Sequence, residues 1–150
     1  MAQPALSLRA RALRSLARRE HTRSELRRKL APHEETEGQL DALLDALQAQ
    51  GFLSDERAAA SLVHRRAARL GTQRLRQELQ AKGLGASTVD AALEGLGGTE
   101  LERARVLWER KFGAPASDAS GRARQMRFLL ARGFASDTVR RVVRGVEDDS

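Results

Sequence analysis

The chain lacks cysteine and tyrosine and has few aromatic residues of any kind. Its 150 residues include no Cys, no Tyr, one Trp and four Phe. The absence of Cys excludes disulfide bonds, thiol chemistry and Cys-based metal sites, and it favours the cytoplasm as the location. So few aromatic side chains cannot form a stacking platform for single-stranded nucleic acid.

Long hydrophobic runs are also absent. No apolar run approaches the roughly 18 residues that a membrane-spanning helix requires, and Met1–Ser7 lacks the basic flank and apolar stretch of a signal peptide. We therefore expect a cytoplasmic protein with no membrane association. Lysine is scarce as well, since Arg supplies all but three of the 27 basic residues, and the net charge is +7. Such a surface indicates a polyanionic partner, either nucleic acid or an acidic protein face.

Motifs for catalysis or metal binding are missing. His21, His33 and His64 have no metal-ligand spacing, and we expect all three on the surface. The carboxylates cluster at expected helix starts, where capping and solvation account for them. No glycine-rich loop follows a strand, because no strand is expected. We therefore predict that the chain is not an enzyme and that it takes no metal, cofactor or small-molecule substrate.

Apolar residues recur at helical spacing in three places. Each place carries a quartet at positions i, i+3, i+4 and i+7, which is one face of an α-helix. The quartets begin at Leu40, Val89 and Val139, so they repeat after 49 and then 50 residues. A helical pattern with a period near 50 indicates an array of helical units with an extended binding surface. The four members of each quartet are Leu40, Leu43, Leu44 and Leu47; Val89, Ala92, Leu93 and Leu96; and Val139, Val142, Val143 and Val146.

The middle helices carry the same repeat. Leu26 and Leu30 correspond to Leu75 and Leu79, and Gly83 corresponds to Gly133. Gln125 stands where the pattern calls for a leucine, so we expect Met126 to take that position in the core. We predict an all-α fold of three tandem three-helix repeats in an elongated, curved array. The expected repeats are residues 1–53, with 1–7 disordered, residues 54–98, and residues 99–150, with 145–150 a frayed acidic tail.

Helix boundaries follow from capping residues. Thr22 and Glu25 form the pattern of a capping box, and the helix behind them must end before Pro32. The third helix is expected to begin near Thr36 or Glu37, and the fourth to extend to about Leu70. The segment 114–121 is the longest insertion and is expected to be mobile. The other residues expected to begin or cap helices are Ser54, Thr72, Ser87, Thr99 and Ser136.

Charge alternates along the chain. Residues 1–33, 59–88 and 103–144 are basic, with net charges of +7, +5 and +8, whereas the segments between them are acidic. One interpretation is that acidic and basic helices neutralise each other within a repeat. The other is a basic stripe along the array, which the third repeat favours because few acidic residues lie near its arginines.

Several segments together resemble the RecX family of recombinase regulators. The segment Gly51-Phe52-Leu53-Ser54-Asp55-Glu56-Arg57-Ala58-Ala59 resembles the family signature, although Ser54 and Ala58 replace the usual Asp or Asn and an aromatic residue. Segments 23–30, 71–84 and 128–134 also resemble family motifs, in the expected order. The resemblance covers residues 8–146 and implies three tandem three-helix repeats.

The resemblance also implies a function. Family members bind the RecA recombinase filament on DNA and inhibit strand exchange, ATP hydrolysis and coprotease activity, thereby modulating DNA repair and the SOS response. They also bind DNA weakly. Carried to this chain, the implied mechanism is that the array lies in the groove of the filament and blocks access or growth; filament capping and groove coating both stay open. We expect a monomer.

Arginines of the second and third repeats are the candidate contacts to the recombinase or to DNA. We propose them because the second repeat has a basic cluster and the third has arginine on the outer face of its quartet helix. The alternative is a DNA-binding helical module that acts without a recombinase. The candidates are Arg57, Arg65, Arg66, Arg69, Arg74, Arg76, Arg127, Arg132, Arg140, Arg141 and Arg144.

Overall fold

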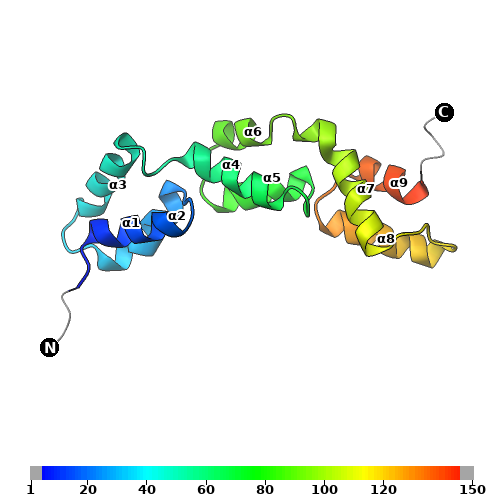
Figure 1. Ribbon diagram of the computed structural model, residues 1–150, viewed down its shortest axis with the longest axis horizontal. Helices are drawn as coiled ribbons and strands as arrows, with labels where there is room; N and C mark the ends of the chain where they lie inside the picture. The colour runs from blue at the N-terminus through cyan, green and yellow to red at the C-terminus, as the bar shows by residue number, and fades with distance from the viewer. Residues whose placement is uncertain (1–4, 146–150) are drawn as a thin grey trace. The chain divides into compact units, whose positions relative to one another are not determined.

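The computed structural model describes residues 5–145, which form nine α-helices, two short 3₁₀-helices and no strand (Figure 1). The expectations for Val146, for the acidic tail and for residues 1–4 lie outside this range. The α-helices are α1 (Leu8–Arg18), α2 (Arg23–Leu30), α3 (Gln39–Ala49), α4 (Asp55–Arg66), α5 (Thr72–Ala81), α6 (Ala86–Leu93), α7 (Glu100–Lys111), α8 (Ala119–Ala131) and α9 (Ser136–Arg144). The 3₁₀-helices are η1 (Ala31–His33) and η2 (Leu96–Thr99).

The described residues divide into two compact units. One contains residues 5–61 and 79–89, and the other contains residues 62–78 and 90–145. The first unit therefore holds α1, α2 and α3, the second holds α7, α8 and α9, and the helices α4, α5 and α6 are shared between them. The repeat boundaries expected from the sequence stay a prediction.

The core of the first unit comes from the apolar faces of α1, α2 and α3. Leu40, Leu44 and Leu47 of the first quartet are buried, and Leu43 packs against them while partly exposed. They meet Leu26 and Leu30 of α2, as the helical spacing predicts. The remaining members of this core are Leu8, Ala12 and Leu53, with Leu13 and Leu16 packed against it.

The core of the second unit is built around the valine quartet. Val139, Val142 and Val143 are buried together with Leu129 and Phe134. Ala104 also belongs to this core, and Leu101, Leu107, Trp108, Met126 and Phe128 pack against it. In the second quartet Val89 and Leu93 are buried and Ala92 is partly exposed. Leu96, its fourth member, lies outside α6 in η2.

The expectation that Met126 takes the core position of α8 is wrong. Gln125 itself occupies it, only 5% exposed, whereas Met126 is partly exposed beside the core. The side-chain amide fits because both of its polar atoms are bonded. The Trp108 indole donates to Gln125 Oε1 at 3.0 Å, and Gln125 Nε2 donates to the carbonyl of Ala114 at 3.1 Å. A buried amide that is fully paired carries no large desolvation penalty.

Side-chain capping explains where several of the described helices begin. Thr22 and Glu25 form the predicted capping box, with the Thr22 hydroxyl accepting from the Glu25 amide at 3.0 Å. Ser54 accepts from the amide of Arg57. Asp118, which the sequence analysis missed, caps α8 by accepting from the amide of Gly121 at 2.7 Å.

Two expected caps are wrong. Helix α6 begins at Ala86, so Ser87 lies inside its first turn rather than at the cap. Helix α9 begins at Ser136, so Ala135 is the N-cap residue. The Glu100 carboxylate accepts from the Ala135 amide at 3.3 Å, which supplies a partner for a backbone donor next to the helix start.

Two helix ends also differ from expectation. Helix α3 begins at Gln39 rather than near Thr36, because Gly38 has a positive φ of 87° that no right-handed helix contains. Helix α4 ends at Arg66 rather than at Leu70. The carbonyls of Ala67 and Leu70 are bonded by a side chain from α7 instead of by the next helical turn.

Candidate interaction surfaces

Four of the eleven candidate arginines already have carboxylate partners. Arg57 bonds Glu20, Arg66 bonds Glu78, and Arg76 bonds Asp90, at 2.7–3.0 Å. Arg140 pairs with Asp137 on its own helix. These are exposed or half-exposed pairs of the kind that contributes at most about 1 kcal/mol to stability.

Pairs between neighbouring helices support the interpretation of local neutralisation in the first two repeats. Arg23 and Arg27 of α2 bond Asp45 and Asp41 of α3. The Arg76–Asp90 pair joins α5 to α6 in the same way. In residues 99–145, by contrast, the arginines of α8 have no carboxylate partner in the described structure.

Five candidate arginines are exposed and have no ion pair within residues 5–145. They share the second unit, and their guanidinium groups are open to an external anion. Arg132 differs because its guanidinium lies 5.0 Å from the centre of the Phe128 ring, which gives it a cation–π contact. The five are Arg69, Arg74, Arg127, Arg141 and Arg144.

A cavity lies beside one of them. It has a volume of about 270 Å³ and is lined by residues of α5 and of the turn between α8 and α9. Arg74 and Gln77 supply polar side chains, and Leu130 is an exposed leucine at 43% accessibility on its wall. An exposed apolar side chain beside a cation is typical of protein interfaces.

Close backbone contact fixes the position of Arg74. The Gly71 amide donates to the carbonyl of Arg132 at 2.8 Å. Gly133 has a φ of +89°, and a Cβ there would lie 2.2 Å from the Cβ of Arg74. Only glycine therefore allows the α8–α9 turn to approach the first turn of α5.

The first unit contains the corresponding junction. The Thr22 hydroxyl donates to the carbonyl of Lys82 at 2.7 Å, and a Cβ on Gly83 would lie 2.4 Å from the Ser24 hydroxyl oxygen. Thr22, Lys82 and Gly83 stand one repeat before Gly71, Arg132 and Gly133. The period of 49 to 50 residues therefore repeats a contact between modules as well as the helices.

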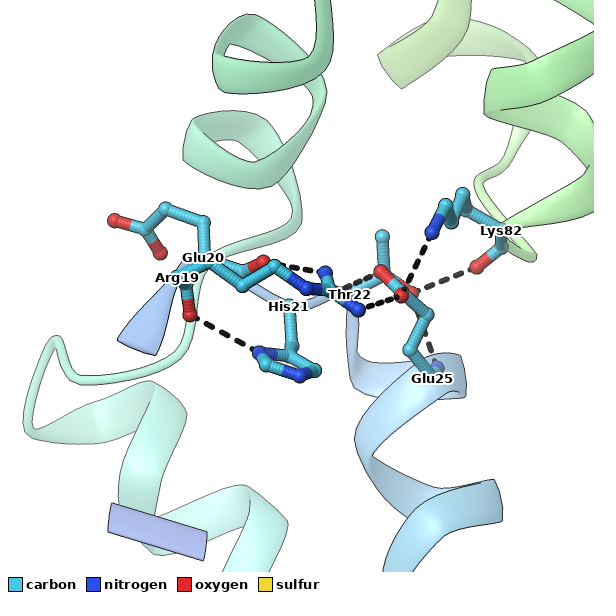
Figure 2. Close-up of polar contacts among 6 residues, drawn as sticks. All are labelled: Arg19, Glu20, His21, Thr22, Glu25 and Lys82. Atoms are coloured by element: carbon cyan, nitrogen blue, oxygen red, sulfur yellow. Dashed lines mark hydrogen bonds and ion pairs between the residues drawn. The ribbon is translucent and has the colours of Figure 1, made fainter. Parts of the chain in front are cut away.

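Glu25 strengthens the first of these junctions (Figure 2). Its carboxylate accepts from Arg19 at 2.9 Å, from Lys82 at 3.0 Å and from the Thr22 amide at 3.1 Å. Burial alone would raise the pKa of Glu25, but these three donors outweigh it and lower that pKa to about 2. The carboxylate is therefore charged at any physiological pH.

His21 lies beside this network and corrects the expectation of a surface histidine. It is 3% exposed, and its Nδ1 atom lies 3.0 Å from the Arg19 carbonyl oxygen (Figure 2). Burial lowers the pKa of the imidazole below its ordinary value, although the Arg19 carbonyl opposes this. His33 and His64 are exposed, as expected.

Arg103 is a partly buried basic residue whose role the sequence did not reveal. Its guanidinium donates to the carbonyls of Ala67 and Leu70 at 2.8 and 2.6 Å, and to the Thr72 hydroxyl at 3.1 Å. Burial lowers the pKa of Arg103 below its ordinary value. This side chain joins α7 to the corner between α4 and α5, so its role is structural.

Residues 5–145 offer neither a metal site nor a membrane span. No group of three or more His, Cys, Asp or Glu side chains there could hold a metal ion. None of the helices in that range combines the length and apolar character needed to cross a bilayer.

Sequence models of the RecX family match three consecutive parts of the chain. The model for "RecX, first three-helix domain" matches residues 9–47, the second domain matches 54–93, and the third matches 99–143. Each matched segment contains most or all of one of the three quartets.

Curated proteins named "Regulatory protein RecX" are similar over almost the whole chain. The protein of Leptothrix cholodnii is 58% identical over 142 residues, which cover 95% of this chain and 90% of that protein. The protein of Ralstonia pickettii is 50% identical over 143 residues, with 95% and 90% covered. The protein of Herminiimonas arsenicoxydans is 46% identical over 149 residues, with 99% of both chains covered.

Two solved structures have the same fold. The crystal structure of a regulatory protein RecX gives a TM-score of 0.73 at 23% identity, covering 97% of this chain and 81% of that chain. RecX from Lactobacillus salivarius gives a TM-score of 0.75 at 19% identity, covering 91% and 92%. Together with the domain matches, they confirm an all-α protein of three three-helix domains.

Proposed function

The chain belongs to the RecX family of regulatory proteins, and we propose that it acts by lying along the RecA filament on DNA through arginines of its second and third repeats. Proteins of this family inhibit the RecA recombinase and are not enzymes. The membership confirms the function inferred from the sequence, and the observation that carries it is 58% identity to a RecX regulatory protein over almost the whole chain.

The finer mechanism rests on charge and exposure. We propose that Arg69, Arg74, Arg127, Arg141 and Arg144 make the primary contacts, because their guanidinium groups are exposed and carry no ion pair in residues 5–145. Arg65 and Arg132 extend the same basic surface. Arg57, Arg66, Arg76 and Arg140 must exchange an existing carboxylate partner before they can bind another anion.

Three further proposals complete this function. We propose that the protein is a monomer, that it acts in the cytoplasm where the recombinase assembles on DNA, and that it binds DNA weakly by itself. The excess of arginine over lysine supports contact with phosphate or carboxylate groups, because a guanidinium bonds either one through two parallel donors.

Charge reversal tests the recombinase contact. We expect the double variant Arg69→Glu with Arg74→Glu to need at least about tenfold more protein to inhibit the DNA-dependent ATPase of the recombinase. Removing one hydrogen bond between charged groups weakens binding by about 1.5–3 kcal/mol. Circular dichroism should stay helical, because both side chains are exposed.

A matched control separates these residues from net charge. The double variant Arg110→Glu with Arg122→Glu makes the same charge change at exposed positions outside the candidate set. It should inhibit as the native chain does. Full inhibition by the Arg69 and Arg74 variant would show that these two arginines do not contact the recombinase.

A further inference from the structure

A second basic surface lies on the first repeat, where the sequence analysis placed no candidate residue. A cavity of about 340 Å³ opens between α1 and α2. Three arginines of α1 line it at spacings of three and four residues, and Lys29 of α2 stands across from them. The arginines are Arg11, Arg14 and Arg18.

None of these four cations has a carboxylate partner in residues 5–145, whereas Arg23 and Arg27 of α2 do. No acidic side chain of the described residues lines the cavity. Four unpaired cations around one concave site repel each other, and an anion placed there removes that repulsion. The cavity is therefore suited to a negatively charged ligand. Its remaining lining residues are Leu6, Ser15, Leu30 and His33.

Ser15 adds a hydroxyl group to the wall of the cavity, on the same helix as the three arginines. A serine hydroxyl can donate one hydrogen bond. Among four cations, this hydroxyl is placed to donate to an anionic oxygen.

The donors and acceptors of the site select between two kinds of polyanion. The cavity wall offers guanidinium, ammonium and hydroxyl donors, and its described side chains include no carboxylate or carboxamide acceptor. An acidic peptide brings one N–H donor for every carbonyl. The Ser15 hydroxyl and the His33 ring are the only described side-chain acceptors lining the cavity, so the wall could bond few of those donors. A phosphodiester backbone brings acceptors alone, so its hydrogen-bonding groups match the wall.

The three arginines form a row along α1, and the length of this row favours a polymer with several phosphates over a single ion. Arg11 and Arg18 are seven residues apart, which is about 10 Å along the helix axis. One phosphate group cannot reach both ends, whereas consecutive phosphates of a strand can. Leu6, 44% exposed, adds an apolar surface for the sugar.

We propose that this cavity, formed by Arg11, Arg14, Ser15, Arg18 and Lys29, binds the phosphate backbone of a nucleic-acid strand. The inference rests on the DNA binding proposed above and not on the recombinase contact. It assigns that binding to residues of the first repeat and not to the arginines assigned to the recombinase.

Fluorescence anisotropy with a labelled 20-nucleotide oligothymidylate tests the proposal on the full chain. Four phosphate contacts predict that the logarithm of the affinity falls with the logarithm of the salt concentration at a slope of about −3. The double variant Arg14→Gln with Arg18→Gln should lower the affinity at least about tenfold and reduce the slope to about −1.4, because two contacts remain.

Two further variants separate the site from general charge and from folding. Arg9→Gln lies on the same helix but does not line the cavity, so its affinity should be unchanged. Ser15→Ala changes no charge and favours the helix, so it should keep the melting temperature yet lower the affinity about threefold or more. An unchanged affinity in Ser15→Ala would overturn the role of the hydroxyl.

Competitors identify the ligand. Inorganic phosphate and thymidine monophosphate should displace the oligonucleotide only at far higher concentration than unlabelled oligothymidylate, because each offers a single phosphate. Displacement by poly-glutamate at the same charge concentration would overturn the assignment to nucleic acid and favour an acidic protein. Binding that survives in the Arg14 and Arg18 variant would place DNA elsewhere, whereas no binding by the native chain would refute the DNA binding itself.

Discussion

The charge of Glu25 should stabilise the protein in a pH-dependent manner. Replacing Glu25 by Gln keeps an amide oxygen that can accept from the Thr22 amide, because Gln also completes a capping box. It removes the negative charge that Arg19 and Lys82 bond at 2.9 and 3.0 Å. The variant therefore isolates the charge from the cap.

The structure sets the size of the effect. A pKa lowered from 4.5 to about 2 corresponds to about 3 kcal/mol at full strength. Arg19 and Lys82 are both at least a third exposed, so solvent screening reduces the expected effect to about 1–2 kcal/mol. We expect Glu25→Gln to lower the free energy of unfolding by that amount at pH 7.

The direction in which this stabilisation changes with pH follows from the pKa difference between the folded and unfolded chain. The carboxylate has a lower pKa in the folded than in the unfolded chain, so its stabilisation is fully present above about pH 4.5 and is lost as the pH falls toward 2. Urea unfolding of both proteins at pH 7 and at pH 2.5 should therefore show a difference that shrinks in acid. Salt should shrink it as well.

Glu37→Gln is the control, because Glu37 is exposed and no ion pair holds it in the described structure. It should change the free energy of unfolding by less than about 0.5 kcal/mol at either pH. A loss in Glu25→Gln that is the same at pH 7 and pH 2.5 would refute the reasoning, because it could not come from the charge.

Two further predictions concern the second unit. Gly133→Ala should lower the free energy of unfolding by at least about 2 kcal/mol, because it combines a positive φ with a Cβ 2.2 Å from that of Arg74. Gly95 has φ +86°, and a Cβ there would meet no other atom, so Gly95→Ala should lower the free energy of unfolding by only about 1 kcal/mol. Equal losses for the two variants in thermal unfolding would rule out the crowding at Gly133. Arg103→Lys should cost about 1–3 kcal/mol, because one ammonium cannot bond the carbonyls of Ala67 and Leu70 and the Thr72 hydroxyl together. Arg110→Lys, exposed on the same helix, should cost almost nothing, and a similar melting temperature for both variants would contradict the structural role of Arg103.

Features determined within one helical turn could be predicted from the sequence. The quartets identified the buried faces of α3 and α9, because burial follows the 3.6-residue period. The Thr22–Glu25 capping box was predicted for the same reason, since both partners lie three residues apart. Family resemblance supplied the function, which the charge pattern alone left open between DNA and protein.

Features determined by distant partners could not be predicted. Gln125 is buried because the Trp108 indole, 17 residues away, donates to it. Arg103 reads in the sequence as one more basic residue, and only its carbonyl partners some 33 to 36 residues earlier make it structural. The phosphate site on α1 was missed because it depends on which cations lack partners, and that property belongs to the folded chain.

The N-terminal end of α8 has a different neighbour from the equivalent ends of α2 and α5. At those two helices, Thr22 and Gly71 bond a carbonyl from the turn of the following repeat. At α8, a Cβ on Gly121 would lie 2.8 Å from the Cβ of Ala116 and 3.0 Å from a carboxylate oxygen of Asp118. The chain's own insertion therefore covers the face on which a further module would dock. A helical module fused after the third repeat would have to attach in another way, because Ala116 and Asp118 already cover the surface that joins one repeat to the next.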